Sequence, residues 1–286
     1  MTRSKHTIIF VFLLLAFGLT AKAQSSARFP FEGAIHSYTC DGITPGAGYE
    51  FYLAANIDGS GRLDDALTGE FDFLDSATGI VDTDGLASIN IQWNNGAAAN
   101  IYYLWLEATI PDGCSNNIRL EIAPQINAFD LLSENIPVTN TISCPVADAG
   151  NGFNPMAESY SAGATTLQFK VRRENGTLNP AIAGSTYDWS FIPQLTVDPD
   201  LAGKINVIVT VEEATLSGSR YTVNGQYDEV LVTVSIENAP GFDLDVTLLV
   251  TGQQESNTNL TDSTPENDGV THRIQVMPLI DGMGGV

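Results

Sequence analysis

Polar and apolar residues alternate in short runs along most of the chain. In the run 88–93 the apolar residues Ile89, Ile91 and Trp93 fall on one face, and the polar residues between them fall on the other. Alternation with a period of two is typical of a strand that buries one face. Almost no stretch repeats apolar residues at helical spacing, and clusters of Gly, Asn, Asp and Pro separate the runs. The pattern therefore predicts an all-β protein.

The strand-like runs form two groups, separated by a stretch without a clear strand pattern. The first group is predicted at residues 35–39, 49–54, 70–73, 88–93, 101–108 and 117–122. The second group is predicted at residues 165–172, 186–191, 205–211, 229–236, 242–250 and 272–277. The intervening stretch contains several prolines and glycines, and we expect one short helix or strand in it, around 129–133. Short strands with frequent turn signals are typical of sandwiches, so each group is predicted to form one.

The first residues carry the pattern of a secretory signal peptide. Arg3 and Lys5 precede an apolar run at 8–19, and the small-x-small sequence Ala21-Lys22-Ala23 follows. The run is shorter than the roughly 20 apolar residues that a membrane-spanning helix needs. We therefore expect an exported protein of the periplasm or cell surface. The predicted organisation is a signal peptide at 1–23, a sandwich at 24–125, a junction at 126–163, a second sandwich at 164–278 and a flexible tail at 279–286.

The charge of the chain narrows the range of partners. It holds 34 acidic residues against 12 Lys and Arg, a formal net charge of −22. Binding to a phosphate backbone requires a basic surface, so nucleic acid is excluded as a partner. Anionic lipid surfaces also repel an acidic protein, and no segment after the signal peptide is long and apolar enough to span a bilayer, so membrane insertion is not expected.

Motifs of catalysis and of cofactor binding are missing from the sequence. No Gly-x-Ser-x-Gly, P-loop or His-Glu-x-x-His occurs, and only His36 and His272 follow the signal peptide. We interpret both histidines as polar strand residues, and we predict no enzyme activity, no cofactor and no bound metal. Trp93, Trp105 and Trp189 fall inside predicted strands, where core packing is expected. A hydrolase with an unrecognised pair of carboxylates stays an alternative, because such a pair needs no motif.

Three cysteines, Cys40, Cys114 and Cys144, follow the signal peptide. An exported protein can form disulfides, and three cysteines allow one bridge. Cys40 follows the first predicted strand, and Cys114 lies in the turn between the last two strands of the first sandwich, so the two loops can meet at one end. We predict a Cys40–Cys114 bridge, with Cys114–Cys144 as the alternative. No Cys-x-x-Cys occurs, so a cysteine metal site is not expected.

An oxygen-rich segment at 56–65 has weak similarity to a calcium loop. Asn56, Asp58 and Ser60 stand at alternate positions, and Asp64 follows. No Glu stands where a bidentate ligand closes such a loop, and no helix is predicted on either side. We interpret the segment as a solvated turn and retain these four residues as a weak calcium candidate.

Several motifs of the first predicted sandwich occur in the same order in a known group of domains. They are a His36-x-Tyr38 strand, Gly48-Tyr49-Glu50-Phe51, Ile91-Gln92-Trp93, the strand 103–107 and the loop Asp112-Gly113-Cys114-Ser115. Residues 30–123 thereby resemble the PKD/Ig-like domains of Bacteroidota surface proteins. The resemblance implies two tandem Ig/PKD-like β-sandwich domains in an exported protein associated with gliding motility or type IX secretion. Phe51 stands where those domains usually have Trp, and the C-terminal sorting domain of that secretion system is not present in the sequence.

The resemblance also implies candidate sites of O-glycosylation. Proteins of that phylum are modified at Asp-Ser or Asp-Thr followed by a small or aliphatic residue, or by Thr. Asp75-Ser76-Ala77 and Asp262-Ser263-Thr264 match that sequon, and both lie in predicted loops. Ser76 and Ser263 are therefore candidates for modification.

These observations favour a non-enzymatic structural or interaction protein of the bacterial cell surface. The resemblance implies an accessory of a gliding or type IX secretion apparatus, or a surface-filament subunit. Its partners would be other cell-envelope or surface proteins, or further copies of itself. A carbohydrate-binding or adhesive module is the alternative, and it requires Tyr102, Tyr103 and Trp105 to form an exposed row on one sheet.

The segment 24–31 is a candidate for a strand shared between molecules. It precedes the first predicted strand, and it carries Phe29 and Phe31 at alternate positions. Pro30 lacks an N–H group, so the segment can pair only on one side or at an edge. The alternative is that this segment is the first strand of its own sandwich, or a frayed terminus.

Overall fold

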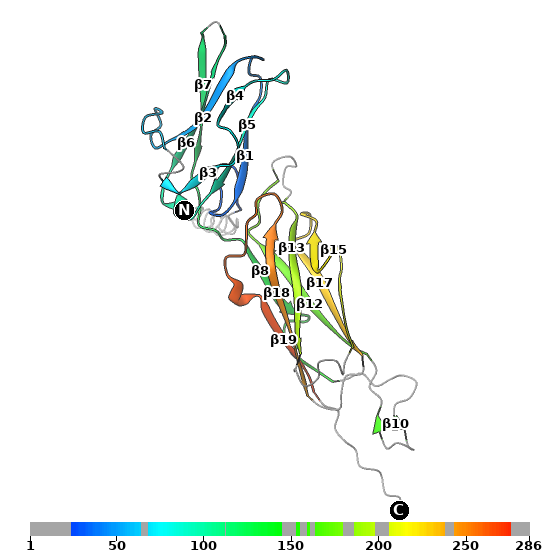
Figure 1. The fold of residues 1–286 in the computed structure, drawn as a ribbon. Helices are drawn as coiled ribbons and strands as arrows, with labels where there is room; N and C mark the ends of the chain where they lie inside the picture. The colour runs from blue at the N-terminus through cyan, green and yellow to red at the C-terminus, as the bar shows by residue number, and fades with distance from the viewer. Residues whose placement is uncertain are drawn as a thin grey trace, which may run out of the picture.

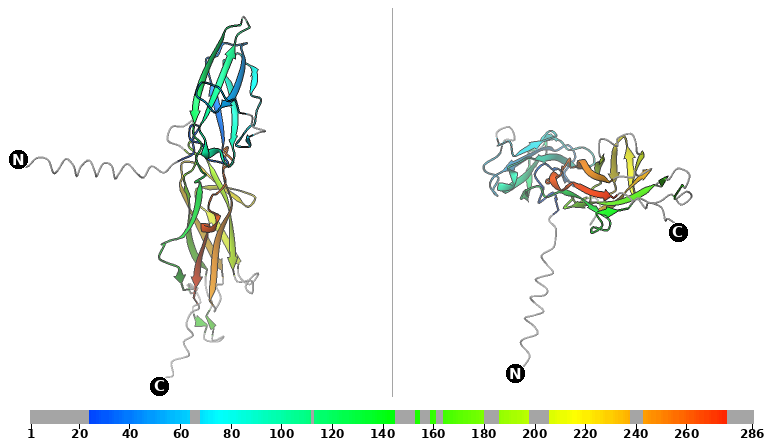
Figure 2. Two further views of the ribbon diagram at one scale, coloured as in Figure 1. Left: turned by 90° about the vertical axis from the view of Figure 1, so that its left-hand side faces the viewer. Right: turned by 90° about the horizontal axis from the view of Figure 1, so that it is seen from below.

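The computed structural model describes residues 24–63, 68–111, 113–144, 153–154, 159–160, 164–179, 186–197, 206–237 and 243–275. Two β-sandwiches lie end to end in this part of the chain (Figures 1 and 2). The all-β sandwich fold predicted from the alternating pattern is confirmed. None of the described helices is long and apolar enough to cross a membrane.

The first sandwich packs a three-stranded sheet on a four-stranded one. The smaller sheet has the order β1 (Ile35–Cys40), β5 (Ala87–Trp93) and β3 (Phe71–Phe73). The larger sheet has the order β4 (Thr78–Ile80), β2 (Gly48–Ala54), β6 (Tyr102–Thr109) and β7 (Ser115–Ile122). A 3-10 turn, η1 (Ala97–Ala99), precedes β6. All pairs of neighbouring strands in these two sheets are antiparallel, as expected for a sandwich.

The second sandwich packs a four-stranded sheet on a six-stranded one. The first of these has the order β14 (Asn206–Val211), β17 (Glu229–Glu237), β12 (Thr165–Glu174) and β8 (Asp130–Asn135). The other has the order β15 (Ala214–Ser217), β16 (Arg220–Val223), β13 (Trp189–Val197), β18 (Leu244–Glu255), β19 (Gly269–Ile274) and β9 (Ile142–Ser143). A separate pair, β10 (Phe153–Asn154) with β11 (Ser159–Tyr160), and a 3-10 turn, η3 (Pro265–Asn267), complete the described elements.

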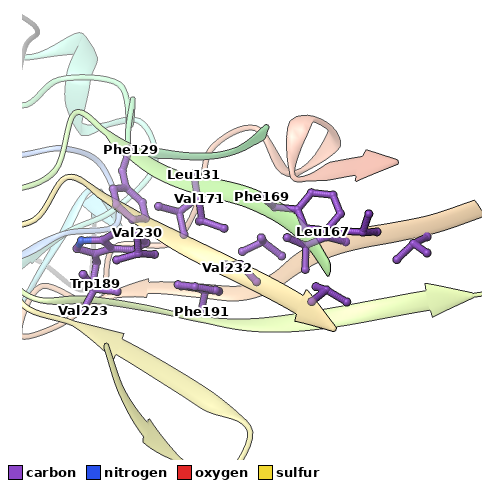
Figure 3. Packing of buried hydrophobic residues seen from close by; sticks show 14 of the residues in the cluster. Phe129, Leu131, Leu167, Phe169, Val171, Trp189, Phe191, Val223, Val230 and Val232 are labelled. Carbon is purple, nitrogen blue, oxygen red and sulfur yellow. The ribbon is translucent and has the colours of Figure 1, made fainter. Parts of the chain in front are cut away.

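Alternation along the strands builds the core of the second sandwich. Leu167, Phe169 and Val171 of β12 are buried, and the residues between them are more exposed. Figure 3 shows these side chains packed with Trp189 and other residues from the facing sheet. Trp189 and Trp93 are each 0% exposed, so the prediction that both are core residues is confirmed.

The predicted junction contributes strands to the second sandwich. Strand β8 lies within residues 126–163 and pairs along its length with β12. Strand β9 lies in the same range and pairs in parallel with β19. Part of the predicted junction therefore belongs to the second sandwich. The sequence did not predict these two edge strands clearly, because the stretch is rich in proline and its apolar residues alternate only weakly.

The segment 25–35 ties the two sandwiches together. The Leu178 N–H donates to the Ser25 carbonyl at 3.2 Å, and the Ile35 N–H donates to the Thr258 carbonyl at 2.9 Å. Phe31 is 1% exposed and packs in the core of the second sandwich. Phe31 is therefore not available to a neighbouring molecule, contrary to the shared-strand hypothesis. Phe31 thus belongs to the core of the second sandwich, whereas Phe29 is 53% exposed.

A buried hydrogen bond between Ser25 and His36 closes the same connection. Ser25 Oγ lies 2.9 Å from His36 Nε2, and it accepts the Phe31 N–H at 2.9 Å. Burial lowers the pKa of His36 from 6.5 to about 4, because the charged ring is poorly solvated there. The connection is thus built around a neutral histidine.

Acid pH is expected to destabilise the protein through His36. A histidine whose pKa is lower in the folded state binds a proton on unfolding, so its contribution to stability is complete above about pH 6.5 and is lost as the pH falls toward 4. The difference between the two pKa values corresponds to roughly 3 kcal/mol. Urea denaturation from pH 7.5 to 4 should show a steeper loss in the wild type than in His36→Gln, which keeps an acceptor but does not titrate. Parallel curves would contradict this expectation.

Candidate functional site: the open flank of the first sandwich

One flank of the first sandwich is bordered by two edge strands. Among the described strands, β1 pairs only with β5, and β7 pairs only with β6. In an Ig sandwich the sheets have the strand orders A-B-E-D and C-F-G. Strands β1, β5 and β3 take the places of B, E and D, and β2, β6 and β7 take those of C, F and G. The place of strand A, beside β1, has no named strand among the described residues.

The segment before β1 covers only the end of this flank that faces the second sandwich. The Ala123 N–H donates to the Arg28 carbonyl at 2.9 Å, and the Gln125 N–H donates to the Pro30 carbonyl at 2.7 Å. Phe31 and Gln125 form a parallel bridge that continues this pairing. Before Arg28 the segment runs beside β1, since Ser25 Oγ lies 2.9 Å from His36 Nε2 and the Ala27 carbonyl accepts the Tyr38 hydroxyl at 2.9 Å. No strand in the described part of the chain covers the rest of the flank.

Two neighbouring cavities lie along the uncovered part of the flank. Their volumes are about 370 and 400 Å³, and they share the lining residues Cys40, Leu106 and Ile118, so they lie next to each other. We call the two together the β1–β7 groove. Its apolar lining is made of Tyr38, Ile43, Phe51, Leu104, Leu106, Ile110, Ile118 and Leu120.

Exposure along β7 shows how the groove opens. Ile122, Leu120 and Ile118 stand at alternate positions, opposite Tyr102, Leu104 and Leu106 of β6. Ile122 is fully buried, Leu120 is half-buried and Ile118 is 58% exposed. The exposure rises with distance from the segment that covers the lower end. The inward-facing side chains of β7 are therefore buried in the core at one end of the strand and exposed to solvent toward the other.

The floor of the groove is the core itself. Tyr38, Phe51, Leu104 and Leu106 belong to the core cluster of the first sandwich, and each keeps an exposure of 4 or 5%. Core residues away from this flank, such as Leu53, are fully buried. An extended apolar segment lying in the groove would remove this remaining exposure, and each apolar Å² buried contributes roughly 25 cal/mol.

The backbone of β7 offers hydrogen-bonding groups along the groove. The Ile110 N–H donates to the Cys114 carbonyl, so this pair of residues is hydrogen-bonded and the pattern alternates along the β6–β7 ladder. The backbone groups of residues 117, 119 and 121 therefore point away from β6. Residue 123 is next in this series, and its N–H is the one that donates to Arg28. A strand in the groove would continue the pairing that Arg28 and Pro30 begin.

The groove carries little charge. Among the described residues of its lining, Asp41 and Arg119 are the charged ones. The Arg119 guanidinium lies 5.5 Å from the centre of the Trp105 ring, on the outer face of the sheet, because residues 105 and 119 are register partners. The hollow therefore suits an apolar, uncharged segment in a protein that is otherwise strongly acidic.

Two of the three cysteines lie at the groove. Cys40 and Cys114 both line the cavity nearest the tip of the sandwich, and Cys144 is exposed elsewhere. All three are free thiols in the structure, so the predicted Cys40–Cys114 bridge is not formed in it. The shared cavity agrees with the expectation that the two loops meet at one end, and the bridge itself stays a prediction. Burial raises the pKa of the Cys40 thiol, and Asp41 adds to this effect.

The weak calcium candidate is a turn held by its own hydrogen bonds. The Ser60 N–H and hydroxyl donate to Asp58 Oδ1 at 2.9 and 2.6 Å, and the Asn56 amide donates to Ser60 Oγ at 3.0 Å. These bonds from Ser60 lower the pKa of Asp58. Asp64, the fourth candidate, lies outside the described residues. The three described groups are engaged with one another, as in an exposed Asx turn.

The two histidines belong to different sandwiches and do not meet. His36 bonds to Ser25, whereas His272 is 5% exposed and its Nε2 lies 3.0 Å from Ser143 Oγ. Burial lowers the pKa of His272 as well. Both histidines lie in strands, as predicted, and the structure adds that each is buried beside a serine.

Both glycosylation candidates lie at the surface. Ser76 is exposed and donates to the Thr78 carbonyl at 2.8 Å. Ser263 is exposed and donates to the Phe129 carbonyl at 2.8 Å. Modification of either serine stays a prediction.

The aromatic side chains of β6 do not form one exposed row. Tyr102 is 1% exposed and points into the core, whereas Trp105 points to the opposite face of the sheet. Trp105 stacks on Tyr52 with a ring separation of 6.2 Å and is itself 7% exposed. The Arg62 guanidinium covers Tyr52 at 3.6 Å from the ring centre. Arg62, Tyr52 and Trp105 thus stack on one another, and they do not form the flat exposed platform that carbohydrate binding requires.

Sequence reasoning missed a cluster of carboxylates in the second sandwich. Asp130, Asp262 and Asp268 each place an oxygen within 4.8 Å of the others. Asp262 accepts the Leu131 and Thr264 N–H groups, both at 2.6 Å. These contacts hold the loop after β18 against β8. Asp130 and Asp268 are 138 positions apart in the sequence, and no sequence motif connects the three residues.

Comparison with known proteins identifies no family for this chain. No protein-family model matches the chain, and no curated protein matches it. Similar solved structures include the CupB2 chaperone of Pseudomonas aeruginosa (10% identity, 88% of this chain and 99% of that one, TM-score 0.29). Others are fibronectin(III)-like modules of Clostridium thermocellum CbhA (10% identity, 94% and 97%, TM-score 0.28) and Dpr2 Ig1-Ig2 in complex with DIP-Theta Ig1-Ig3 (10% identity, 86% and 92%, TM-score 0.26).

Proposed function

We propose that the protein is a non-enzymatic structural or interaction protein that binds extended segments of other polypeptides at the β1–β7 groove. The observation that carries the proposal is the uncovered flank, where an apolar core floor lies beside a free strand edge. Addition of a strand to such an edge combines backbone hydrogen bonds with pockets for alternate side chains. An unpaired edge of this kind is also a liability unless a partner or a covering element occupies it.

The proposed setting is the bacterial cell envelope. The signal-peptide pattern at 1–23 supports export to the periplasm or the cell surface. The resemblance of residues 30–123 to domains of Bacteroidota surface proteins supports a role as an accessory of a gliding or type IX secretion apparatus, or as a surface-filament subunit. Rigid sandwiches joined by a hydrogen-bonded connection suit a protein that spaces its partners.

A charge placed in the groove is expected to remove binding of partners. Ile118→Glu puts a carboxylate at an exposed position of the groove wall, so folding should survive, whereas an apolar segment would have to bury the charge. Ile80→Glu is the matched control, because Ile80 is 76% exposed on β4, the opposite edge strand of the same sheet. Cross-linking in the native envelope, followed by mass spectrometry, measures which proteins are captured.

The proposal expects wild type and Ile80→Glu to capture the same proteins, and Ile118→Glu to lose them. Thermal unfolding of the three proteins checks that the sandwich is intact in each. Unchanged capture by Ile118→Glu would refute binding at the groove.

A further inference from the structure

We infer that the β1–β7 groove of one molecule binds the C-terminal segment 276–286 of a second copy, so that copies join head to tail. The inference rests on the proposed function, since it names the occupant of the same groove. It is carried by three features: the chemistry of the groove, the composition of the segment, and the end of the molecule at which the segment is attached.

The composition of the segment matches the lining of the groove. Residues 276–286 read Val-Met-Pro-Leu-Ile-Asp-Gly-Met-Gly-Gly-Val, in which Asp281 is the single charged residue. The chain as a whole carries a net charge of −22, so most of its surface repels a second copy. An almost uncharged apolar segment is the part of this protein that can enter a groove lined by Tyr38, Leu104 and Ile118 with little repulsion.

The segment is attached at the end of the second sandwich that lies farthest from the groove. Strand β19 pairs with β18 so that Ile274 lies opposite Leu244, the first residue of β18. The other end of β18 lies near the first sandwich, where Thr258 accepts the Ile35 N–H. Figures 1 and 2 show β18 and β19 running along the second sandwich between these two ends. The groove and the attachment point are therefore separated by the length of that sandwich.

The segment is too short to fill the groove of its own molecule. Strand β18 spans Leu244–Glu255, which corresponds to about 36 Å at 3.3 Å per residue. Eleven extended residues reach about 36 to 40 Å at most. A segment that starts beside Leu244 would thus use its whole length before it reached the first sandwich. Residues 276–286 thus do not fill the groove of the molecule that carries them, which leaves the groove of a second copy.

The geometry of the free edge accommodates such a strand. Residues 117, 119 and 121 of β7 present outward-facing backbone groups, and Arg28 and Pro30 pair with the next residues of the same edge, 123 and 125. Pro278 has no N–H, which is tolerated where a strand pairs on one side only. Because the two surfaces differ, the contact is heterologous, and repetition of it generates an open chain of copies.

The experiment measures binding of a fluorescent peptide, residues 275–286, to the mature protein ending at Gln275. This truncation retains every described residue, including Gln275, whose N–H donates to the Ser143 carbonyl. Fluorescence anisotropy should show saturable binding that is unchanged in Ile80→Glu and at least tenfold weaker in Ile118→Glu. A peptide with Leu279→Asp and Ile280→Asp should bind at least tenfold more weakly as well.

Sedimentation velocity of the full mature chain gives the second readout. Multimers should grow with protein concentration, and both the truncation after Gln275 and Ile118→Glu should leave monomers. Multimers that persist in the truncated protein, or peptide binding that Ile118→Glu leaves unchanged, would overturn the inference.

The two proposals fail in distinguishable ways. If the peptide does not bind but Ile118→Glu still loses the envelope proteins that Ile80→Glu captures, the occupant is a different polypeptide and only this inference falls. If Ile118→Glu changes neither peptide binding nor capture, the groove is not a binding site and both proposals fall.

Discussion

Replacing Trp93 with Ala should lower the free energy of unfolding of the first sandwich by about 3–5 kcal/mol. The Trp93 side chain is fully buried, and its ring centre lies 5.1 Å from that of Tyr102 and 6.4 Å from that of Phe71. Its Nε1–H donates to the Tyr38 hydroxyl at 3.1 Å, and that hydroxyl donates to the Ala27 carbonyl at 2.9 Å. The substitution therefore leaves a large cavity and a buried hydroxyl oxygen without its donor.

Urea denaturation combined with peptide-resolved hydrogen exchange tests this expectation. Exchange should accelerate in β1, β5 and β6, and the second sandwich should keep its protection, since each sandwich has its own core. Trp189→Ala is the matched substitution, with a cost of about 3–5 kcal/mol that falls on the second sandwich. Near wild-type stability in Trp93→Ala or Trp189→Ala would mean that the ring is not packed as described.

Replacing Arg173 with Met should destabilise the second sandwich by about 3–5 kcal/mol. Arg173 is 3% exposed, and its guanidinium donates to the Gly225 carbonyl at 3.1 Å and to Asp228 at 3.0 Å. It also lies 4.0 Å from the carboxylate of Glu255, which is fully buried. Burial raises the pKa of Glu255, and the nearby guanidinium opposes that rise. Loss of the arginine leaves a buried carboxylate without its cation.

A double-mutant cycle separates the ion pair from the loss of packing. Glu255→Gln in the Arg173→Met background removes the uncompensated charge, so the double variant should be more stable than Arg173→Met alone. Arg173→Lys keeps the charge but not the forked geometry, so its cost should fall between those of the wild type and Arg173→Met. Additive effects of the two substitutions, measured by urea denaturation, would contradict the coupling.

The alternating pattern located most strands, because each buries one face. Strands β5 and β12 lie within two residues of their predicted ranges. The exceptions carry little alternation. Strand β4 has three residues, Thr-Gly-Ile, with only partial burial, and the β15–β16 hairpin is mostly exposed. Strand β13 extends to Val197, beyond the predicted end at 191, because backbone pairing with β18 holds its more exposed second half.

The candidate site could not be predicted in the same way. Its apolar residues come from β1, β2, β6 and β7, and in the sequence Leu104 has the same pattern as any core residue. Segment 24–31 shows the limit: its Phe-x-Phe alternation predicted a strand that could be shared, yet Phe31 is buried in the second sandwich and Phe29 is exposed. The core in which such a side chain packs is decided by contacts with residues far away in the sequence.

The sequence by itself determined the all-β class, the positions of most strands and the residues that face each core, because the burial of a strand face imposes a local period of two. The cores around Trp93 and Trp189 follow from that period. Only the tertiary structure decided that β1 and β7 become edge strands, that the segment before β1 covers just one end of their flank, and that β8 joins the second sandwich. Strand order and edge coverage arise from pairing between segments far apart in the chain, and local alternation is the same whether a strand is paired on one side or on two.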